Sequence, residues 1–358
     1  MGDGVAQAER RAATPVPYLV GSRYAHHSGH SGYEGFGRHV GRSLRSPLPF
    51  RYLGRGWRLD AAVQSLLDKP CYSASLLVGE VATAAHMAIP SNAVYHVLYG
   101  DTDLRLLGSL GRRLGRPVVA TFHEPAWGLD YMKVSRPVTR DLAAAILVSE
   151  TQRPWFSDLL PPERVAVVPH GVDCQFFQPP PARGAERTCL VVGSKYRDFD
   201  TLEKAIDVVH GRDPSMRFVA IGTDVNTERP LTHGRVQFMS GVDDAGLRRA
   251  YQEASVVVFP LRFATANNAL LEAMACGAPI VASDVGGVSE YLGDGGRLCP
   301  PFDPESLAEA IVETVDAPAA AARLGESARE RALRYDFPHV AGLHRQVYSA
   351  AAQASEVR

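Results

Sequence analysis

The stretch Val256–Glu290, VVVFPLRFATANNALLEAMACGAPIVASDVGGVSE, contains a strand, a turn, a helix and a second strand in one run. The apolar run Val256–Leu261 predicts a buried strand. The polar turn Thr265–Asn268 offers side-chain oxygens that can cap a helix, and Gly277 predicts where that helix ends. A second strand is expected at Ile280–Ala282. Such a unit points the free N–H groups of its helix at the carboxyl edge of a parallel sheet, where phosphate binds in many α/β folds.

Glu272 interrupts the apolar pattern of this predicted helix, because it stands between Leu271 and Ala273. A carboxylate that is buried without a partner destabilises a fold. Two interpretations stay open from the residues alone: Glu272 binds a ligand, or it reaches solvent or a local backbone donor.

Residues 270–287, LLEAMACGAPIVASDVGG, resemble the donor-site motif of retaining, nucleotide-sugar-dependent glycosyltransferases of family 4, which have the GT-B fold. Three other segments resemble parts of the same family in the same order: 165–177, 190–202 and 236–260. The resemblance implies an α/β protein with two Rossmann-like, doubly wound domains that face a central cleft.

The resemblance also implies a donor site in the second half of the chain. Arg197 stands where the family has a phosphate-binding lysine, and Lys195 is expected to supply a second charge. From the residues alone, each could equally be a solvated loop charge. Glu272 corresponds to the glutamate that binds the ribose. The remaining residues predicted to bind the nucleotide sugar are Gly193, Ala266, Asn267 and Asn268.

Two predicted site residues lie in the first half. His123 directly follows the predicted strand Pro117–Phe122, so it is expected at the sheet's carboxyl edge. In the family a histidine here contacts the donor sugar, and we predict that His123, Arg197 and Glu272 are the catalytic residues. Gly32 lies in a glycine-rich segment that resembles the loop approaching the diphosphate, with Tyr33 and Glu34 facing the acceptor. A structural histidine and a plain strand-to-helix connection are the alternatives.

One position departs from the family's pattern. The family has two glutamates separated by seven residues, and counting back from Glu272 leads to Ala264. The absent glutamate is the one that touches the donor sugar's hydroxyls. We therefore expect an unusual or deoxygenated donor sugar, with Asn267 or Asn268 supplying substitute hydrogen bonds.

Metal binding is not expected. The cluster His26, His27 and His30 has no carboxylate or cysteine frame. The pair Asp101 and Asp103 follows a predicted strand, but Asp101 is expected to cap the following helix instead. We predict no metal and no cofactor beyond the nucleotide-sugar donor, with UDP slightly favoured over GDP.

Composition agrees with a two-domain α/β protein. The chain has 358 residues, 46% of them apolar, which is enough for two cores. A formal charge of −1 gives no general attraction to nucleic acid. Five scattered cysteines, no apolar leader and no long apolar run predict a cytoplasmic protein without a membrane-spanning segment. The cysteines are Cys71, Cys174, Cys189, Cys276 and Cys299.

The expected domains are an acceptor-binding domain at 1–168, a donor-binding domain at 169–340 and a last helix at 341–358 that packs back on the first domain. Strands in the first domain are expected at Tyr18–Gly21, Ser75–Val78, Ala93–Leu98, Pro117–Phe122 and Ala144–Val148, and a helix is expected at Leu104–Leu114.

The predicted function is retaining transfer of a sugar from a nucleoside diphosphate sugar to an acceptor hydroxyl. The acceptor could be a bacterial natural product, a glycolipid or a polysaccharide precursor. Two alternatives remain: another GT-B enzyme, such as a phosphorylase or a nucleotide-sugar epimerase, and a non-catalytic nucleotide-sugar-binding protein. The oligomeric state is open.

Overall fold

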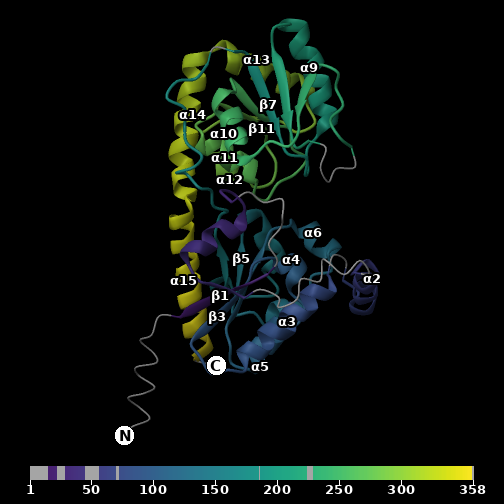
Figure 1. The fold of residues 1–358 in the computed structure, drawn as a ribbon, viewed down its shortest axis with the longest axis vertical. Helices are drawn as coiled ribbons and strands as arrows, with labels where there is room; N and C mark the ends of the chain where they lie inside the picture. The colour runs from purple at the N-terminus through teal and green to yellow at the C-terminus, as the bar shows by residue number, and fades with distance from the viewer. Residues whose placement is uncertain are drawn as a thin grey trace. The chain divides into compact units, whose positions relative to one another are not determined.

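The structure is a computed structural model that describes residues 15–21, 29–44, 56–69, 72–184, 186–223 and 229–356. The chain divides into two compact units (Figure 1). The first consists of Met1–His26, Phe36–Pro169 and Val340–Arg358, and the second of His27–Gly35 and His170–His339.

The first unit contains a parallel six-stranded sheet in the order β2-β1-β3-β4-β5-β6. Its strands are β1 (Val16–Val20), β2 (Arg42–Leu44), β3 (Ala93–Val97), β4 (Val118–Phe122), β5 (Ala144–Leu147) and β6 (Val165–Val167). This is the flavodoxin-like order, in which the chain reverses direction across the sheet between β1 and β3. Ligands in such sheets bind outside the carboxyl ends of the strands at this switch point.

Short helices connect these strands. They are η1 (Tyr33–His39), α2 (Gly56–Leu67), α3 (Ala74–Met87), α4 (Gly100–Asp103), α5 (Leu107–Arg113), α6 (Ala126–Tyr131), α7 (Arg136–Arg140), η3 (Glu150–Gln152), α8 (Arg153–Phe156) and η4 (Pro162–Arg164). The last helix, α15 (Phe337–Glu356), lies mostly in this unit. Its Tyr348 hydroxyl is 2.7 Å from Nδ1 of the buried His96 on β3.

The second unit contains another parallel six-stranded sheet, in the order β12-β11-β10-β7-β8-β9. Its strands are β7 (Thr188–Val192), β8 (Arg217–Ile221), β9 (Val236–Met239), β10 (Val256–Phe259), β11 (Ile280–Ser283) and β12 (Arg297–Cys299). Read from the other side, this is the Rossmann order 3-2-1-4-5-6, and its switch point lies between β7 and β10.

Helices cover both faces of the second sheet. They are α9 (Phe199–Arg212), α10 (Asp244–Glu253), α11 (Asn268–Ala275), α12 (Val288–Leu292), α13 (Pro304–Asp316), α14 (Pro318–Ala332) and η5 (Leu333–Tyr335). Leu190 and Val192 of β7 join a core with α10, α11, α12 and α14, whereas Cys189 and Val191 join a core with α9 and α13. The alternation of a strand's side chains therefore supplies two hydrophobic layers.

The motif that predicted the fold forms the expected unit. Asn267 caps α11, because its side-chain Oδ1 accepts a hydrogen bond from Leu270 N at 3.1 Å. The helix ends before Gly277, whose φ of +60° lies in the left-handed region that glycine favours.

Two expectations about the first unit are wrong. Residues Ser75–Val78 lie in α3 and not in a strand, since the Ser73 side chain caps that helix by accepting from Leu76 N at 3.2 Å. The helix expected from Leu104 begins only at Leu107. The buried Glu80 carboxylate accepts from the N–H groups of residues 105–107 and satisfies the free donors of that helix start. The short edge strand β2 was not foreseen.

The division of the chain differs from the expected domains at residues 27–35. His30 Nδ1 lies 2.8 Å from Asp173 Oδ2, and the His30 ring stacks on Phe176 with 3.7 Å between centroids. Ser31 forms an isolated bridge with Val172. These contacts place part of the glycine-rich segment in the second unit, together with the nucleotide half of the chain.

Candidate active site

Two loops meet at the switch point of the second sheet, one after β7 and one after β10. Asp198 N donates to Pro260 O at 2.7 Å, and Arg262 N donates to Tyr196 O at 2.9 Å. Gly193 starts the first loop with a φ of +78°, in the region that glycine adopts without strain. The loops are therefore held together where a Rossmann sheet binds its ligand.

Arg197 is buried at this point, with only 7% of its surface exposed. Its Nε and Nη2 atoms donate to Val192 O at 3.2 and 2.6 Å, and Nη1 donates to Lys195 O at 3.4 Å. Its guanidinium also lies over the Phe259 ring, 5.3 Å from the centroid. Burial lowers the pKa of the guanidinium to about 10.

No carboxylate in the described parts of the chain lies within ion-pair distance of Arg197. A buried charge that is compensated by carbonyl dipoles alone is costly, and an anionic ligand would relieve that cost. The switch point therefore carries a positive charge that is suited to an anion.

Glu272 is also buried, with 4% of its surface exposed. Its carboxylate accepts hydrogen bonds from the Tyr251 hydroxyl, at 2.9 Å, and from the Ser31 side chain. Burial raises the pKa of this carboxyl to about 7, although both hydrogen bonds lower it. The solvent-facing alternative for Glu272 is therefore wrong, and the glutamate joins the segment around Ser31 to α11.

The amino end of α11 lies one helical turn before Glu272. Ala266, Asn267 and Asn268 are partly exposed there. Asn268 Oδ1 lies 2.9 Å from Nδ1 of His170. His170 was not foreseen as a site residue, although a histidine directly before the Gly171 turn in a segment resembling the family could have indicated it.

Lys195 is exposed, and its Nζ lies 5.1 Å from the centroid of the Tyr196 ring. Ala264, which stands at the position of the absent glutamate, is 4% exposed. Its carbonyl accepts from Gly287 N at 2.8 Å. A side chain longer than alanine would have to displace packed atoms at this position.

His123 lies in the first unit, directly after β4, and is partly exposed. Its Nε2 is 2.9 Å from Leu98 O. The buried Asp101 carboxylate accepts from His123 N at 2.9 and 3.1 Å and from Glu124 N at 3.1 Å. The prediction that Asp101 caps the following helix is therefore wrong, because no side chain caps α5 and the Asp101 carboxylate instead fixes the turn that carries His123. Burial raises the pKa of Asp101 to about 6.

Gly32 lies in the second unit with a φ of +95°. Tyr33, which was expected to face the acceptor, is 1% exposed and packs near the His170 ring, 5.2 Å between centroids. That expectation for Tyr33 is wrong. At this φ, Gly32 has a backbone conformation that residues with a side chain rarely adopt.

Among the described residues, no group of three or more His, Cys, Asp or Glu side chains is arranged to hold a metal ion. His26 and His27 lie outside the described residues, as does Cys71. The other four cysteines are buried and free. In the described part of the chain, no helix has the length and apolar character needed to cross a membrane.

The chain is similar in sequence to known glycosyltransferases. The model of glycosyl transferases group 1 matches residues 186–317. Phosphatidyl-myo-inositol mannosyltransferase of Mycolicibacterium smegmatis is 28% identical over 256 residues, covering 66% of this chain and 66% of that protein. MMP alpha-(1->4)-mannosyltransferase of Mycolicibacterium hassiacum is 26% identical over 306 residues, covering 79% of this chain and 70% of that protein.

A solved structure extends the likeness over nearly the whole chain. Sucrose-phosphate synthase of Thermosynechococcus elongatus superposes with a TM-score of 0.65 at 20% identity, covering 97% of this chain and 92% of that one. The two parallel sheets and these matches define a glycosyltransferase of the GT-B class. Within that class, residues 186–317 match the model of glycosyl transferases group 1, and the two sequence relatives are mannosyltransferases.

Proposed function

We propose that this protein transfers a sugar from a nucleoside diphosphate sugar to a hydroxyl of an acceptor, with retention of the anomeric configuration. The single observation that carries the proposal is Arg197, a buried cation without a carboxylate partner among the described residues, at the switch point of a Rossmann sheet. Departure of the nucleoside diphosphate builds negative charge, and fixed cations and helix N-termini stabilise that charge.

The other residues take roles that their positions favour. The N–H groups at Ala266, Asn267 and Asn268 accompany Arg197 around the diphosphate, Gly193 and Gly32 give the backbone room, and Lys195 adds an exposed charge. Glu272 binds the ribose. His123, held by Asp101 in the first unit, orients the sugar. The acceptor hydroxyl then attacks the sugar from the face on which the diphosphate departs, and an oxygen of the departing phosphate takes the proton of that hydroxyl. This geometry retains the anomeric configuration.

The identities of the donor's base and sugar are further proposals, and both depend on the proposed transfer from a nucleoside diphosphate sugar. Uridine is the base that we favour. Alanine at position 264 favours an unusual or deoxygenated donor sugar, and a mannosyl donor is the alternative, because both sequence relatives are named mannosyltransferases. The acceptor class stays open among small natural products, glycolipids and polysaccharide precursors.

The direct test is thermal unfolding against UDP-, GDP-, dTDP- and ADP-sugars and the free diphosphates, with and without EDTA. A ligand that binds only the folded protein stabilises it by about 2.7 kcal/mol at a concentration of 100 Kd. We expect one nucleotide family to raise the midpoint, and the rise to be the same with EDTA because the site uses Arg197 in place of a metal. No rise with any nucleotide would reject the proposed donor site, and a rise lost in EDTA would reject metal independence.

The donor sugar provides a second prediction. Ala264 is packed tightly, so we expect Ala264→Glu to lower the thermal midpoint and to leave turnover with UDP-glucose no higher than in the wild type. Ala264→Ser is the matched small control. Turnover that increases in Ala264→Glu, with UDP-glucose as the best donor, would contradict the proposal of an unusual donor sugar.

A non-catalytic nucleotide-sugar-binding protein is the second candidate, and alanine at position 264 is the observation that favours it. Both candidates bind the nucleotide. Hydrolysis or transfer of the sugar from a bound nucleotide sugar would exclude the non-catalytic candidate. Release of a sugar phosphate in the presence of free phosphate would indicate a phosphorylase.

A further inference from the structure

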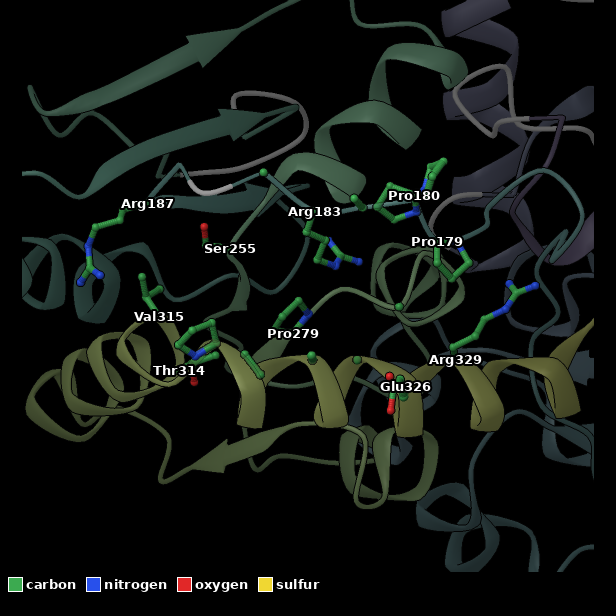
Figure 2. A pocket seen from close by; sticks show the side chains of 18 of the residues that line it. Pro179, Pro180, Arg183, Arg187, Ser255, Pro279, Thr314, Val315, Glu326 and Arg329 are labelled. Carbon is green, nitrogen blue, oxygen red and sulfur yellow. The ribbon is translucent and has the colours of Figure 1, made fainter.

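A cavity of about 1100 Å³ lies at the amino edge of the second sheet (Figure 2). Residues that precede β7, β10 and β11 line it, namely Arg187, Ser255 and Pro279. The segment 179–184 and helix α14 form its other walls. Arg197 lies at the carboxyl edge of the same sheet, so this cavity is separate from the proposed donor site.

Arg183 reaches into the cavity and holds the carboxyl ends of two helices. Its Nη1 donates to the carbonyls of Tyr251, Gln252 and Ala254, at 3.0, 3.0 and 3.3 Å. Its Nη2 donates to Cys276 O at 2.7 Å. These bonds leave the Nε–H and one Nη2–H without an acceptor among the described residues.

Arg329 of α14 is arranged in the same way. Its Nη1 donates to Phe177 O and Ala275 O at 2.9 and 2.7 Å, and its Nη2 donates to Cys174 O at 3.0 Å. Its Nε–H and second Nη2–H also have no acceptor in the described parts of the chain. Two guanidinium groups therefore line one cavity, and both use only main-chain carbonyls.

The charges of these two arginines are not neutralised within the described residues. No ion pair joins either side chain to a carboxylate, whereas Arg187 is paired with Asp213 and Asp316, at 2.7 and 2.6 Å. In Figure 2 the Arg329 guanidinium and the Glu326 carboxylate extend from α14 in opposite directions. Burial lowers the pKa of Arg183, whose side chain is partly buried.

We propose that this cavity binds a small organic anion, with a phosphate or carboxylate group on Arg183 or Arg329 and an apolar body against the prolines. The free N–H groups of the two guanidiniums match the oxygens of such a group. Pro179, Pro180 and Pro279 supply apolar walls.

The test uses phenyl phosphate and benzoate as probes, with benzyl alcohol as the neutral analogue, in calorimetric titrations of the full chain. Ala322 is exposed and lines the cavity, so Ala322→Trp blocks it without touching either arginine. Ala319→Trp on the same helix is the matched control, because Ala319 is exposed and does not line the cavity. Ala322→Glu adds a negative charge that repels an anionic probe, and it replaces Ala322→Trp in the test if the tryptophan variant does not fold.

We expect at least one anion to bind the wild type and Ala319→Trp, with affinity at least tenfold weaker in Ala322→Trp and Ala322→Glu and unchanged in Arg197→Ala. Binding of phenyl phosphate without binding of benzoate would identify the ligand class as phosphate esters. Binding of benzoate without binding of phenyl phosphate would identify it as carboxylates. Equal binding of benzyl alcohol, no binding of either anion, or binding that is lost in Arg197→Ala and kept in Ala322→Trp would each overturn the proposal.

Discussion

Arg197→Ala is expected to lower turnover with a nucleotide-sugar donor by about 10²- to 10³-fold. Loss of a single preorganised donor to a developing negative charge has an effect of this size, about 2.7 to 4 kcal/mol. Arg197 fits that role because it is buried, charged and bonded only to carbonyl oxygens among the described residues. Steady-state kinetics and calorimetric titration with the free nucleoside diphosphate measure the effect.

Two further variants test what the charge and the shape of each cationic side chain contribute to turnover. Arg197→Lys keeps the charge, but an ammonium lacks the planar set of N–H donors that lets a guanidinium bond Val192 O and a phosphate at the same time. We therefore expect an intermediate loss of turnover. Lys195→Ala removes an exposed charge, and we expect a loss of less than about threefold, in line with the small energies of exposed charges. If Arg197→Ala keeps donor affinity and turnover within threefold of the wild type while it folds, Arg197 does not bind the diphosphate.

Glu272→Gln is expected to stabilise the protein at pH 8 while weakening donor binding. Its folded pKa of about 7 lies above the ordinary value of 4.5. The folded protein therefore holds a proton that the unfolded chain releases, so this stability is present below pH 4.5 and is lost as the pH rises through 7. The difference of about 2.5 pKa units corresponds to about 3 kcal/mol.

Glutamine keeps an oxygen for the Tyr251 hydroxyl and carries no charge at any pH. We therefore expect the thermal midpoint of Glu272→Gln to equal that of the wild type near pH 4.5 and to exceed it at pH 8. Comparing the two proteins cancels the contribution of Asp101, whose raised pKa affects both equally. Donor affinity at pH 8 should fall about tenfold or more, because a hydrogen bond to a charged group is worth about 1.5 to 3 kcal/mol.

Two results would contradict this account of Glu272. A midpoint that is lowered at pH 8, and lowered less at pH 4.5, would mean that the ionised carboxylate stabilises the fold. An unchanged donor affinity would mean that Glu272 serves only to join Ser31 and Tyr251. The combination of higher stability and lower affinity is the behaviour expected of a strained functional group.

Local patterns were sufficient for the elements around the candidate site. The apolar run at Val256, the capping Asn267 and the stop at Gly277 each act within one or two turns of chain, and the structure confirms all three. The same kind of reasoning failed at Ser75–Val78. A short apolar run fits a strand and a buried helix equally well, and only the cap from Ser73 and the packing of α3 on α5 decide between them.

The sequence by itself indicated the strand, turn and helix around the candidate site, the resemblance to a family, and which charged residues stand next to strand ends. Those properties depend on neighbours along the chain. The tertiary structure alone decided that Arg197 and Glu272 are buried, that Ser31 bonds Glu272, and that Arg183 and Arg329 line one cavity. These facts depend on residues far apart in the sequence, because burial and the resulting pKa shifts arise only when distant segments exclude water together.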